Sequence, residues 1–507
     1  MNAKRIQSLF PMVLVVLAVV VVLWPLIRPG FYISDDGEWM VIRLSAFYQS
    51  LRDHQFPVRF LGRLNNSYGY PVSNFLYPGF LYIGSLFHFV GFTFVDSVKI
   101  MLGGSVIGTA VVIFLWLRRE FSRFSSSVGV LGFVCAPYLL FDLYKRGSVG
   151  EILAFFPASL GIYSIESGKR WLFPLSIAFL IVSHNTLALL FITVFVVFIL
   201  VRKKFEYLWL LLLGLVMATF FWLPAIMEKK LILFDMVTVS DPFSYFLTLQ
   251  NFWLIGLSGI IACFMILVTF RKSTVKKSGA IYVLFFLASV WAASPYSRAL
   301  WEIPALATLI QFPFRMLAVG TLMTPWVVAS VSEKCIHQKI LFSVILIAIL
   351  AVPVWNTLYA ISFNNRDEGY YTTNEGTTTV MNEYMPRWVS RMQNSRSSER
   401  LIISSGRGRI VYEYLNTQRV IAHIETSEES VVRLNTIYYP GWGITIDNVP
   451  KNISYQNPDG LIEVSVPVGS HRLIAEFRET VPRFLADLIS LIGVLGYIVY
   501  MFKTHRQ

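Results

Sequence analysis

Charged residues are scarce in this sequence. Asp, Glu, Lys and Arg make up 14% of its 507 residues, whereas hydrophobic residues make up 55%. A soluble domain carries about 25% charged residues, and the mean hydropathy here is +0.59. This balance excludes a single soluble globular protein, and it also excludes a disordered chain, a collagen and a coiled coil.

Cysteine is scarce as well, with three residues in the chain, Cys135, Cys263 and Cys335. Two of them lie in apolar runs and one lies in a short basic loop. An odd number without metal-ligand spacing excludes a disulfide framework and offers no zinc or redox site.

Acidic residues are outnumbered by basic ones, 30 to 43, which gives a formal net charge of +13. Such a charge is common among nucleic-acid-binding proteins. In an apolar chain it more often reflects Lys- and Arg-rich cytoplasmic loops. We therefore expect no nucleic-acid partner.

Long apolar runs recur along most of the chain, which indicates a polytopic α-helical membrane protein of about 12 spans. The first run is uncharged from Ile6 to Ile27 and is followed by no small-residue cleavage motif. We interpret it as an uncleaved span that begins in the cytoplasm. The other predicted spans are 98–117, 126–143, 151–166, 171–182, 184–201, 207–224, 251–270, 279–293, 314–331, 340–361 and 483–502.

Six clusters of Lys and Arg lie between or after these spans, and all six fall on the cytoplasmic side of the predicted topology. The segment 72–92 is apolar enough to cross as well, but a crossing there would turn every later cluster outward. It contains Pro78, Gly79 and His88. We interpret it as a re-entrant or interfacial helix, or as a span compensated by another error. Both termini are then cytoplasmic, and a large first loop, 30–97, faces outward.

The stretch 362–482 differs from the rest because it is polar and contains short alternating runs separated by turn signals. It predicts an extracytoplasmic β-sandwich that follows the membrane domain 1–361. A final anchor and cytoplasmic tail, 483–507, would tether it. The alternating runs are Arg409–Tyr414, Arg419–Ile424, Val431–Ile437, Ile462–Val466 and Arg472–Phe477.

Three carboxylates crowd the start of the first outer loop, at Asp35, Asp36 and Glu38. They fit a general base with a partner that orients it. They fit a solvated helix start equally well, because Asp and Glu are common at helix N-termini. Arg43, on the helix expected to follow, would lie beside them. A divalent metal at Asp35 and Asp36 is a weaker alternative, so the cofactor stays unknown.

Two arginines occur in similar aromatic and proline-containing settings at the predicted outer interface. Arg59 follows Gln55-Phe56-Pro57-Val58, and Arg315 follows Gln311-Phe312-Pro313-Phe314. A guanidinium in such a place suits a phosphate headgroup, which it binds bidentately. Ordinary snorkelling toward lipid headgroups is the commoner explanation.

Further polar groups interrupt the apolar stretches. Arg146 and Glu151 flank a turn on the predicted outer side, where basic residues indicate either an anion ligand or a capped turn. His184 and Asn185 lie at a tight turn inside an apolar run and need internal partners. A buried histidine with satisfied hydrogen bonds is commoner there than a reactive one.

In the polar stretch, Glu383 and Tyr384 combine a carboxylate with an aromatic ring. Such a pair can bind a sugar ring if it is exposed. It belongs as often, and here by preference, to the core and corners of a sandwich.

These motifs, in this order, resemble a family of bacterial multi-pass proteins labelled 6-pyruvoyl-tetrahydropterin synthase-related membrane domain, which is related to YfhO-like proteins and to GT-C glycosyltransferases. The label implies no pterin chemistry here. The matching pieces are Asp36-Gly37-Glu38, Phe56-Pro57-Val58-Arg59, Gly69-Tyr70-Pro71, Tyr77-Pro78, Arg146-Gly147 with Glu151, Ser183-His184-Asn185, Gln311-Phe312-Pro313-Phe314-Arg315, Glu383-Tyr384-Met385-Pro386, Tyr439-Pro440-Gly441-Trp442 and Glu479-Thr480.

The resemblance implies a GT-C-like fold and sugar transfer from a polyprenyl-phosphate carrier. Asp36 aligns with the acidic residue of the first outer loop, and family members commonly carry His-Asp where this chain has Asp35-Asp36. The candidate catalytic residues are Asp36, Asp35 and Glu38. The candidate substrate-binding residues are Arg43, Arg59, Tyr70, Tyr77, Arg146, Glu151, His184, Asn185, Gln311, Arg315, Glu383 and Tyr384.

The expected function is therefore a GT-C-type glycosyltransferase of the cytoplasmic membrane, acting on its outer face. The donor would be a polyprenyl-phosphate-linked sugar, and the acceptor a glycan or cell-wall component. One alternative is a non-catalytic lipid-linked glycan transporter or envelope assembly factor that uses the same pocket. Another is a receptor-like anchor whose function lies in the β-domain alone.

Overall fold

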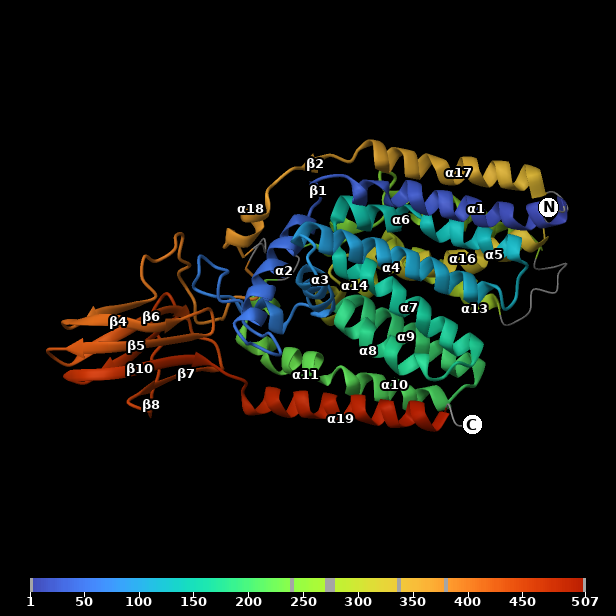
Figure 1. Ribbon diagram of the computed structural model, residues 1–507. Helices are drawn as coiled ribbons and strands as arrows, with labels where there is room; N and C mark the ends of the chain where they lie inside the picture. Colours follow the sequence, from blue (N-terminus) through green and yellow to red (C-terminus); the bar gives the residue numbers. More distant parts are fainter. Residues whose placement is uncertain (1–2, 238–240, 270–278, 335–338, 378–381, 505–507) are drawn as a thin grey trace.

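A computed structural model of the chain describes residues 3–237, 241–269, 279–334, 339–377 and 382–504. It consists of a helical bundle and a β-domain that lies beyond one end of the bundle (Figure 1). Cys335, the predicted basic cluster 271–277 and most of the cluster 334–339 lie outside the described residues.

Most of the chain is helical. The helices are α1 (Ala3–Leu23), α2 (Gly37–Arg52), α3 (Gly79–Phe89), α4 (Phe94–Leu117), α5 (Arg123–Val134), α6 (Pro137–Leu140), α7 (Val149–Ser167), α8 (Leu172–Ser183), α9 (Asn185–Arg202), α10 (Glu206–Met217), α11 (Thr219–Glu228), α12 (Leu257–Thr269), α13 (Ala280–Ala293), α14 (Arg298–Trp301), α15 (Pro304–Ile310), α16 (Leu317–Lys334), α17 (Lys339–Tyr359), α18 (Glu368–Thr373) and α19 (Val481–Thr504).

Several of these helices are long and apolar, which indicates a multi-pass membrane protein. Within the described residues, five are long and apolar enough to cross a membrane, or up to eight if each bent pair forms one span. The bent pairs occur at α5–α6, α10–α11 and α13–α14, with bends of 42°, 70° and 86°. Each predicted span coincides with a helix or a bent pair, but the total of about 12 stays a prediction.

The segment 72–92, which was difficult to assign, forms the short helix α3. Its 11 residues rise about 16 Å, whereas the hydrocarbon core of a bilayer is about 30 Å thick. The helix begins directly after Pro78, since proline suits the start of a helix. A helix of this length fits the re-entrant or interfacial interpretation.

The β-domain contains two antiparallel sheets, of five strands in the order β4-β5-β10-β7-β8 and of three strands in the order β3-β6-β9. All five predicted alternating runs are strands, and the prediction of a separate β-rich domain is confirmed. The sequence interpretation missed β3, β7 and β8. The strands are β3 (Leu401–Ser405), β4 (Gly408–Leu415), β5 (Arg419–Thr426), β6 (Ser430–Ile437), β7 (Trp442–Ile446), β8 (Val449–Lys451), β9 (Leu461–Val466) and β10 (Gly469–Phe477).

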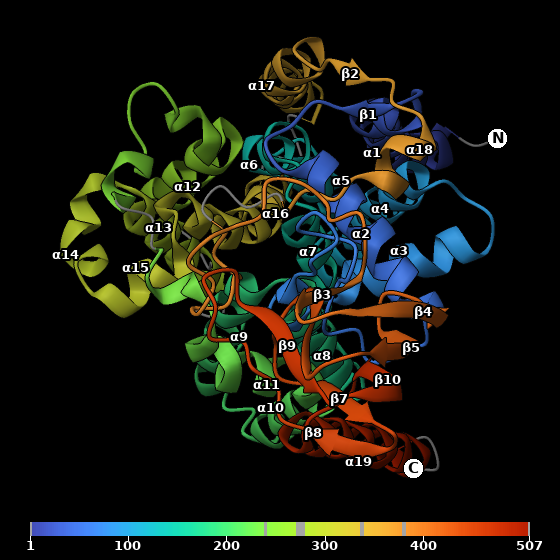
Figure 2. The same cartoon turned by 90° about the vertical axis from the view of Figure 1, so that its left-hand side faces the viewer.

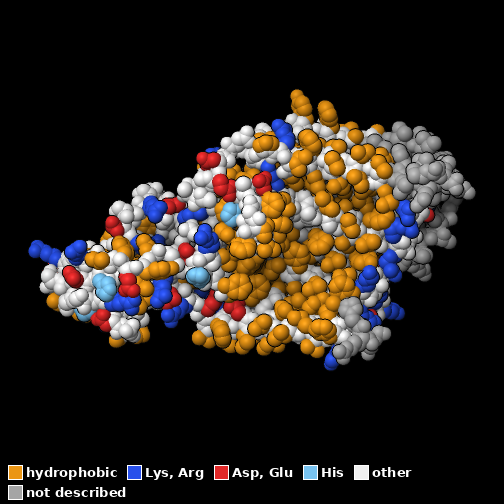
Figure 3. All heavy atoms as spheres, viewed as in Figure 1, with side chains coloured by type: hydrophobic (Ala, Val, Ile, Leu, Met, Phe, Trp, Pro, Cys, Tyr) orange, Lys and Arg blue, Asp and Glu red, His pale blue; other side chains and the backbone are white. Residues whose placement is uncertain are grey.

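The two parts meet around α2, α3 and the loops of the first outer segment, which lie between the bundle and the strands (Figures 1 and 2). A short strand pair fixes the join, because β1 (Phe31–Tyr32) pairs with β2 (Phe363–Asn364). The start of α1 and the end of α19 both lie at the end of the bundle that is far from the β-domain, on opposite sides of it (Figure 1). Hydrophobic side chains cover most of the visible bundle surface, while charged ones gather on the β-domain and at the far end (Figure 3).

Candidate functional site

A cluster of buried charged residues lies where the first outer loop meets the bundle. We call Asp142, Arg146, Glu151, His184 and Arg315 the charge cluster. Each is at most 7% exposed, and Asp142 and Glu151 are fully buried. Nη1 of Arg146 and Nε of Arg315 both lie 2.7 Å from the same oxygen, Oε1 of Glu151. Two carboxylates and two guanidinium groups therefore balance in a largely buried region.

The remaining polar atoms of the charge cluster are mostly satisfied. The Tyr138 hydroxyl donates to Oε2 of Glu151 at 3.0 Å, and Arg315 also donates to the Ile310 carbonyl at 2.8 Å. Nδ1 of His184 accepts a hydrogen bond from the Leu187 amide at 3.2 Å. The proton of the neutral ring then resides on Nε2, which lies 3.8 Å from Glu151. This is the buried, satisfied histidine that the local sequence favoured.

The local sequence explains how the cluster forms. Asp142 and Arg146 are four residues apart in a helical turn, so their side chains share one face and form an ion pair. Gly147 ends that turn in the left-handed region, at φ +65°. A Cβ atom there would lie 2.4 Å from Oγ of Ser34 and 2.7 Å from the Gly37 amide nitrogen. Only glycine therefore lets the carboxylate-bearing loop pack this closely against the turn.

Two backbone hydrogen bonds fix Asp35 and Asp36 against the same turn. The Asp35 amide donates to the Lys145 carbonyl at 2.9 Å, and the Asp36 amide donates to the Arg146 carbonyl at 2.8 Å. The Asp35 side chain points to solvent and pairs with Lys145 at 2.7 Å. Asp36 precedes the first turn of α2.

Asp36 as a residue is exposed, although protein atoms surround much of its carboxylate. Partial loss of hydration raises the pKa of Asp36, while Arg146, Arg43 and Arg315 oppose that rise. Three arginines from three different elements therefore act on this one carboxylate. Among Asp35, Asp36 and Glu38, Asp36 is the residue that is exposed to solvent and whose pKa is also affected by arginines of the charge cluster.

Arg43 is the least satisfied cation near Asp36. It is 5% exposed. Its Nη1 donates a long hydrogen bond to Sδ of Met40, at 3.8 Å. Within the described residues, its Nε has no hydrogen-bond partner, and no carboxylate lies within ion-pair distance. A buried guanidinium in this state is costly, and an anionic ligand would compensate it.

Glu383 of the polar domain approaches the same place. Burial raises the pKa of Glu383, and Arg43 lowers it in part. Tyr384, beside it, packs against Phe75 and Tyr70, with ring centroids 5.9 and 6.3 Å away. The Glu383–Tyr384 pair thus faces the first outer loop. The sequence interpretation had instead favoured a place in the core or corners of the sandwich.

Other predicted residues build the walls of the site. Tyr77 packs against His184, with ring centroids 4.7 Å apart, and Asn185 donates to the Phe75 carbonyl at 3.0 Å. Gln311 accepts from Arg315 at 3.2 Å. Glu38 points away, toward the linker to the β-domain, and pairs with Arg366 at 2.8 Å.

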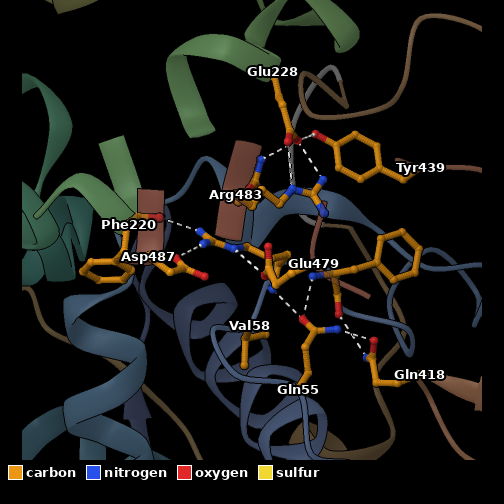
Figure 4. A network of polar contacts seen from close by, with 12 residues as sticks. Gln55, Val58, Phe220, Glu228, Gln418, Tyr439, Glu479, Arg483 and Asp487 are labelled. Carbon is orange, nitrogen blue, oxygen red and sulfur yellow. Dashed lines mark hydrogen bonds and ion pairs between the residues drawn. The ribbon is translucent and has the colours of Figure 1, made fainter. Parts of the chain in front are cut away.

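Arg59 lies apart from these residues. Its Nε, Nη2 and Nη1 are bonded to Glu479 at 3.0 Å, Asp487 at 2.7 Å and the Phe220 carbonyl at 2.8 Å. Figure 4 shows these partners beside the Arg483–Glu228 ion pair, which joins α19 to α11. With each of its three nitrogens engaged by a protein acceptor and 2% exposure, Arg59 ties α19 to the outer loop.

Sequence reasoning missed Asp142 of the charge cluster and Tyr138, whose hydroxyl donates to Glu151. The signal was present, because a carboxylate inside an apolar run is rare and four residues separate it from Arg146. In the described parts of the chain, no group of three or more His, Cys, Asp or Glu residues is arranged to hold a metal ion.

No protein-family model matches the chain, and no curated protein sequence matches it. Among solved structures, the chain is similar to arabinofuranosyltransferase AftD from Mycobacteria, determined by single-particle cryo-EM. The two share 14% sequence identity with a TM-score of 0.46, over 71% of this chain and 27% of AftD. The chain thus spans about a quarter of AftD, and the activity of the whole enzyme does not follow from a match of this extent.

Proposed function

We propose that this protein is a GT-C-type membrane glycosyltransferase that moves a sugar from a polyprenyl-phosphate carrier to a cell-envelope acceptor. One observation carries the proposal: Asp36, an exposed residue fixed by its backbone, lies within the electrostatic influence of Arg43, a buried guanidinium that has no ion pair among the described residues. A base and an anion receptor in one place are what transfer from a phosphate-linked donor requires.

The reaction is a single displacement at the anomeric carbon. The acceptor hydroxyl oxygen bonds to that carbon while its proton passes to the Asp36 carboxylate. The bond between the anomeric carbon and the phosphate oxygen breaks, and its electron pair leaves with polyprenyl phosphate. Attack from the face opposite the leaving group inverts the anomeric configuration. The raised pKa of Asp36 makes it a stronger base than an ordinary aspartate.

The arginines take different parts. Arg43 binds the donor phosphate, because in the described part of the chain no carboxylate lies within ion-pair distance of its guanidinium. Arg146 and Arg315 are already neutralised by Asp142 and Glu151. They hold the loop under Asp36 in place, since the Arg146 carbonyl accepts a hydrogen bond from the Asp36 amide.

The proposed setting is the outer face of the cytoplasmic membrane, with about 12 spans, cytoplasmic termini and the β-domain outside. Two features support it: the six basic clusters on one predicted side, and the ends of α1 and α19 at the far end of the bundle from the β-domain (Figure 1). There, Glu383 and Tyr384 would contact the sugar or the acceptor glycan.

The test uses the full chain in lipid nanodiscs with polyprenyl-phosphate-linked pentose and hexose donors and cell-wall glycan as acceptor. Released polyprenyl phosphate is measured by mass spectrometry. Asp36→Asn should lower release about a hundredfold to ten-thousandfold, the usual contribution of a general base. Asp35→Asn, whose side chain points to solvent, is the matched control and should retain most activity.

A folded Asp36→Asn protein that releases polyprenyl phosphate at the parental rate would falsify the base assignment. Movement of an intact lipid-linked sugar across the bilayer, without release, would instead identify the transporter alternative.

A further inference from the structure

A second site lies at the other end of α2. A groove of about 350 Å³ runs between α2 and α3 and is lined by Tyr48 and Arg52 of α2 and by Tyr82, Ser85, Leu86 and Phe89 of α3. None of these residues belongs to the charge cluster or was singled out in the sequence. The 16 residues of α2 rise about 24 Å, so Arg52 lies far from Asp36 at the helix start.

Two polar groups of the groove lack partners. Arg52 is exposed, and its side chain makes no hydrogen bond or ion pair to the described part of the chain. Oγ of Ser85 is buried, with the residue 4% exposed, and has no hydrogen-bond partner among the described residues. A buried hydroxyl without a partner costs about 1–3 kcal/mol, which a ligand acceptor in the groove would recover. The groove thus offers a cation at its rim and a hydrogen-bond donor at depth.

The rest of the groove edge is apolar and exposed. Leu86, Phe89 and Val90 are 61%, 75% and 62% exposed. Figure 3 shows hydrophobic side chains gathered where Figure 1 places α2 and α3, continuous with the hydrophobic surface of the bundle. An exposed apolar patch of this kind marks contact with a membrane or a partner. Its continuity with the helical bundle favours the membrane.

We propose that this groove binds one anionic phospholipid of the bilayer leaflet on the β-domain side. The headgroup phosphate pairs with Arg52, an ester carbonyl accepts from Ser85, and an acyl chain lies along Leu86 and Phe89. Along the groove, a cation is followed by a hydroxyl and then by an apolar wall. This order matches the phosphate, the ester and the acyl chain of a phospholipid. The glycosyl donor fits less well, because its phosphate must lie near Asp36 and its isoprenoid tail gives Arg52 no anion.

Native mass spectrometry of the detergent-solubilised full chain tests the site with phosphatidylglycerol and phosphatidylcholine as probes. The parental protein should retain phosphatidylglycerol in preference to phosphatidylcholine. Arg52→Gln should weaken phosphatidylglycerol binding about tenfold, the worth of a charged hydrogen bond. Arg28→Gln is the control, because Arg28 is also an exposed arginine after an apolar segment but lies outside the groove. Size-exclusion profiles establish that both variants fold.

A second variant probes the depth of the groove. Ser85→Ala removes the hydroxyl with little change in volume and should weaken phosphatidylglycerol binding by about threefold or more. Equal retention of both lipids, or an Arg52→Gln protein that binds like the Arg28→Gln control, would overturn the proposal. Displacement of phosphatidylglycerol by polyprenyl phosphate would also overturn it and assign the groove to the donor tail. These readouts measure binding alone, so they stand whether or not sugar transfer is found.

Discussion

Nε of Arg315 lies 2.7 Å from Oε1 of Glu151, although 164 residues separate the two in the chain. Nη1 of Arg146 bonds the same oxygen at 2.7 Å. A single fully buried carboxylate thus holds together the turn after α6, the start of α7 and the turn that precedes α16. The loop that carries Asp36 rests on this turn through backbone hydrogen bonds.

Glu151→Gln should therefore be severely destabilising. The substitution keeps the size of the side chain but leaves two buried guanidinium groups with one carboxylate between them. Removing one partner of a buried pair costs about 3–5 kcal/mol. Thermal unfolding of the solubilised protein measures the loss. Glu206→Gln is the control, because its ion pair with Arg170 is exposed and should contribute less than about 1 kcal/mol. Equal effects of the two changes would contradict a central role for Glu151.

The rate of sugar transfer should rise with pH on the acidic side of its pH profile. The midpoint of this rise, the acid limb, should lie at a higher pH than the pKa of an ordinary aspartate. Partial burial raises the pKa of Asp36, and nearby arginines offset this only in part. The base acts in its ionised form, so activity falls as the pH drops through the pKa, and a raised pKa moves that fall to higher pH. The pH dependence of kcat/KM measures the limb. If the residual activity of Asp36→Asn shows the same limb, another group titrates.

Arg43→Gln should move the acid limb further upward. Arg43 lowers the pKa of both Asp36 and Glu383, so its removal raises both. The loss of the phosphate contact should also raise KM for the donor, by about tenfold or more. Arg43→Lys keeps the charge and should leave the acid limb near its parental position. It should still weaken binding of the donor, because a lysine cannot bind a phosphate bidentately. Identical pH profiles for Arg43→Gln and Arg43→Lys would contradict this electrostatic role of Arg43.

Gly147→Ala should impair transfer while leaving the helices intact. The new Cβ would meet Oγ of Ser34 and the backbone of Gly37, at a positive φ of +65°. Gly168→Ala provides a matched control, because Gly168 has a φ of +76° and nothing within 4 Å of the added Cβ. Both variants carry backbone strain of about 1 kcal/mol, so any further loss in Gly147→Ala reports displacement of the Asp36 loop. Transfer rates and circular dichroism of both proteins make the comparison.

Sequence patterns predicted the long apolar helices and five strands of the β-domain because each depends on local periodicity. The runs at 409–414 and 472–477 alternate, and both are strands. Strand β7 (Trp442–Ile446) was missed because it begins directly after Pro440-Gly441, which were interpreted only as a turn. Strand β3 (Leu401–Ser405) starts with three consecutive apolar residues, which do not alternate.

The candidate site was predicted in part because its residues are rare polar groups in apolar or interfacial segments. Their grouping was not predictable, since Arg315 reaches Glu151 through tertiary packing alone. Arg59 and Arg315 share a sequence setting, yet one joins α19 to the outer loop and the other joins the charge cluster. Local sequence cannot distinguish them, because the carboxylates that select each arginine come from distant elements.

That difference gives the last prediction. Arg59→Lys should lower stability and leave the donor KM unchanged. A lysine keeps the charge, but its compact ammonium cannot replace the planar fork that reaches Glu479, Asp487 and the Phe220 carbonyl together. Loss of one or two such bonds should cost roughly 1–3 kcal/mol of unfolding free energy.

Arg478→Lys is the control for Arg59→Lys, because the Arg478 side chain is 76% exposed and, among the described residues, pairs only with its near neighbour Glu476. An exposed pair should contribute less than about 1 kcal/mol, so its melting temperature should stay close to the parental value. Thermal unfolding and donor KM are measured on the same preparations of all three proteins. A raised donor KM in Arg59→Lys with an unchanged melting temperature would place Arg59 on the donor phosphate instead, because only a ligand contact affects binding without affecting the fold.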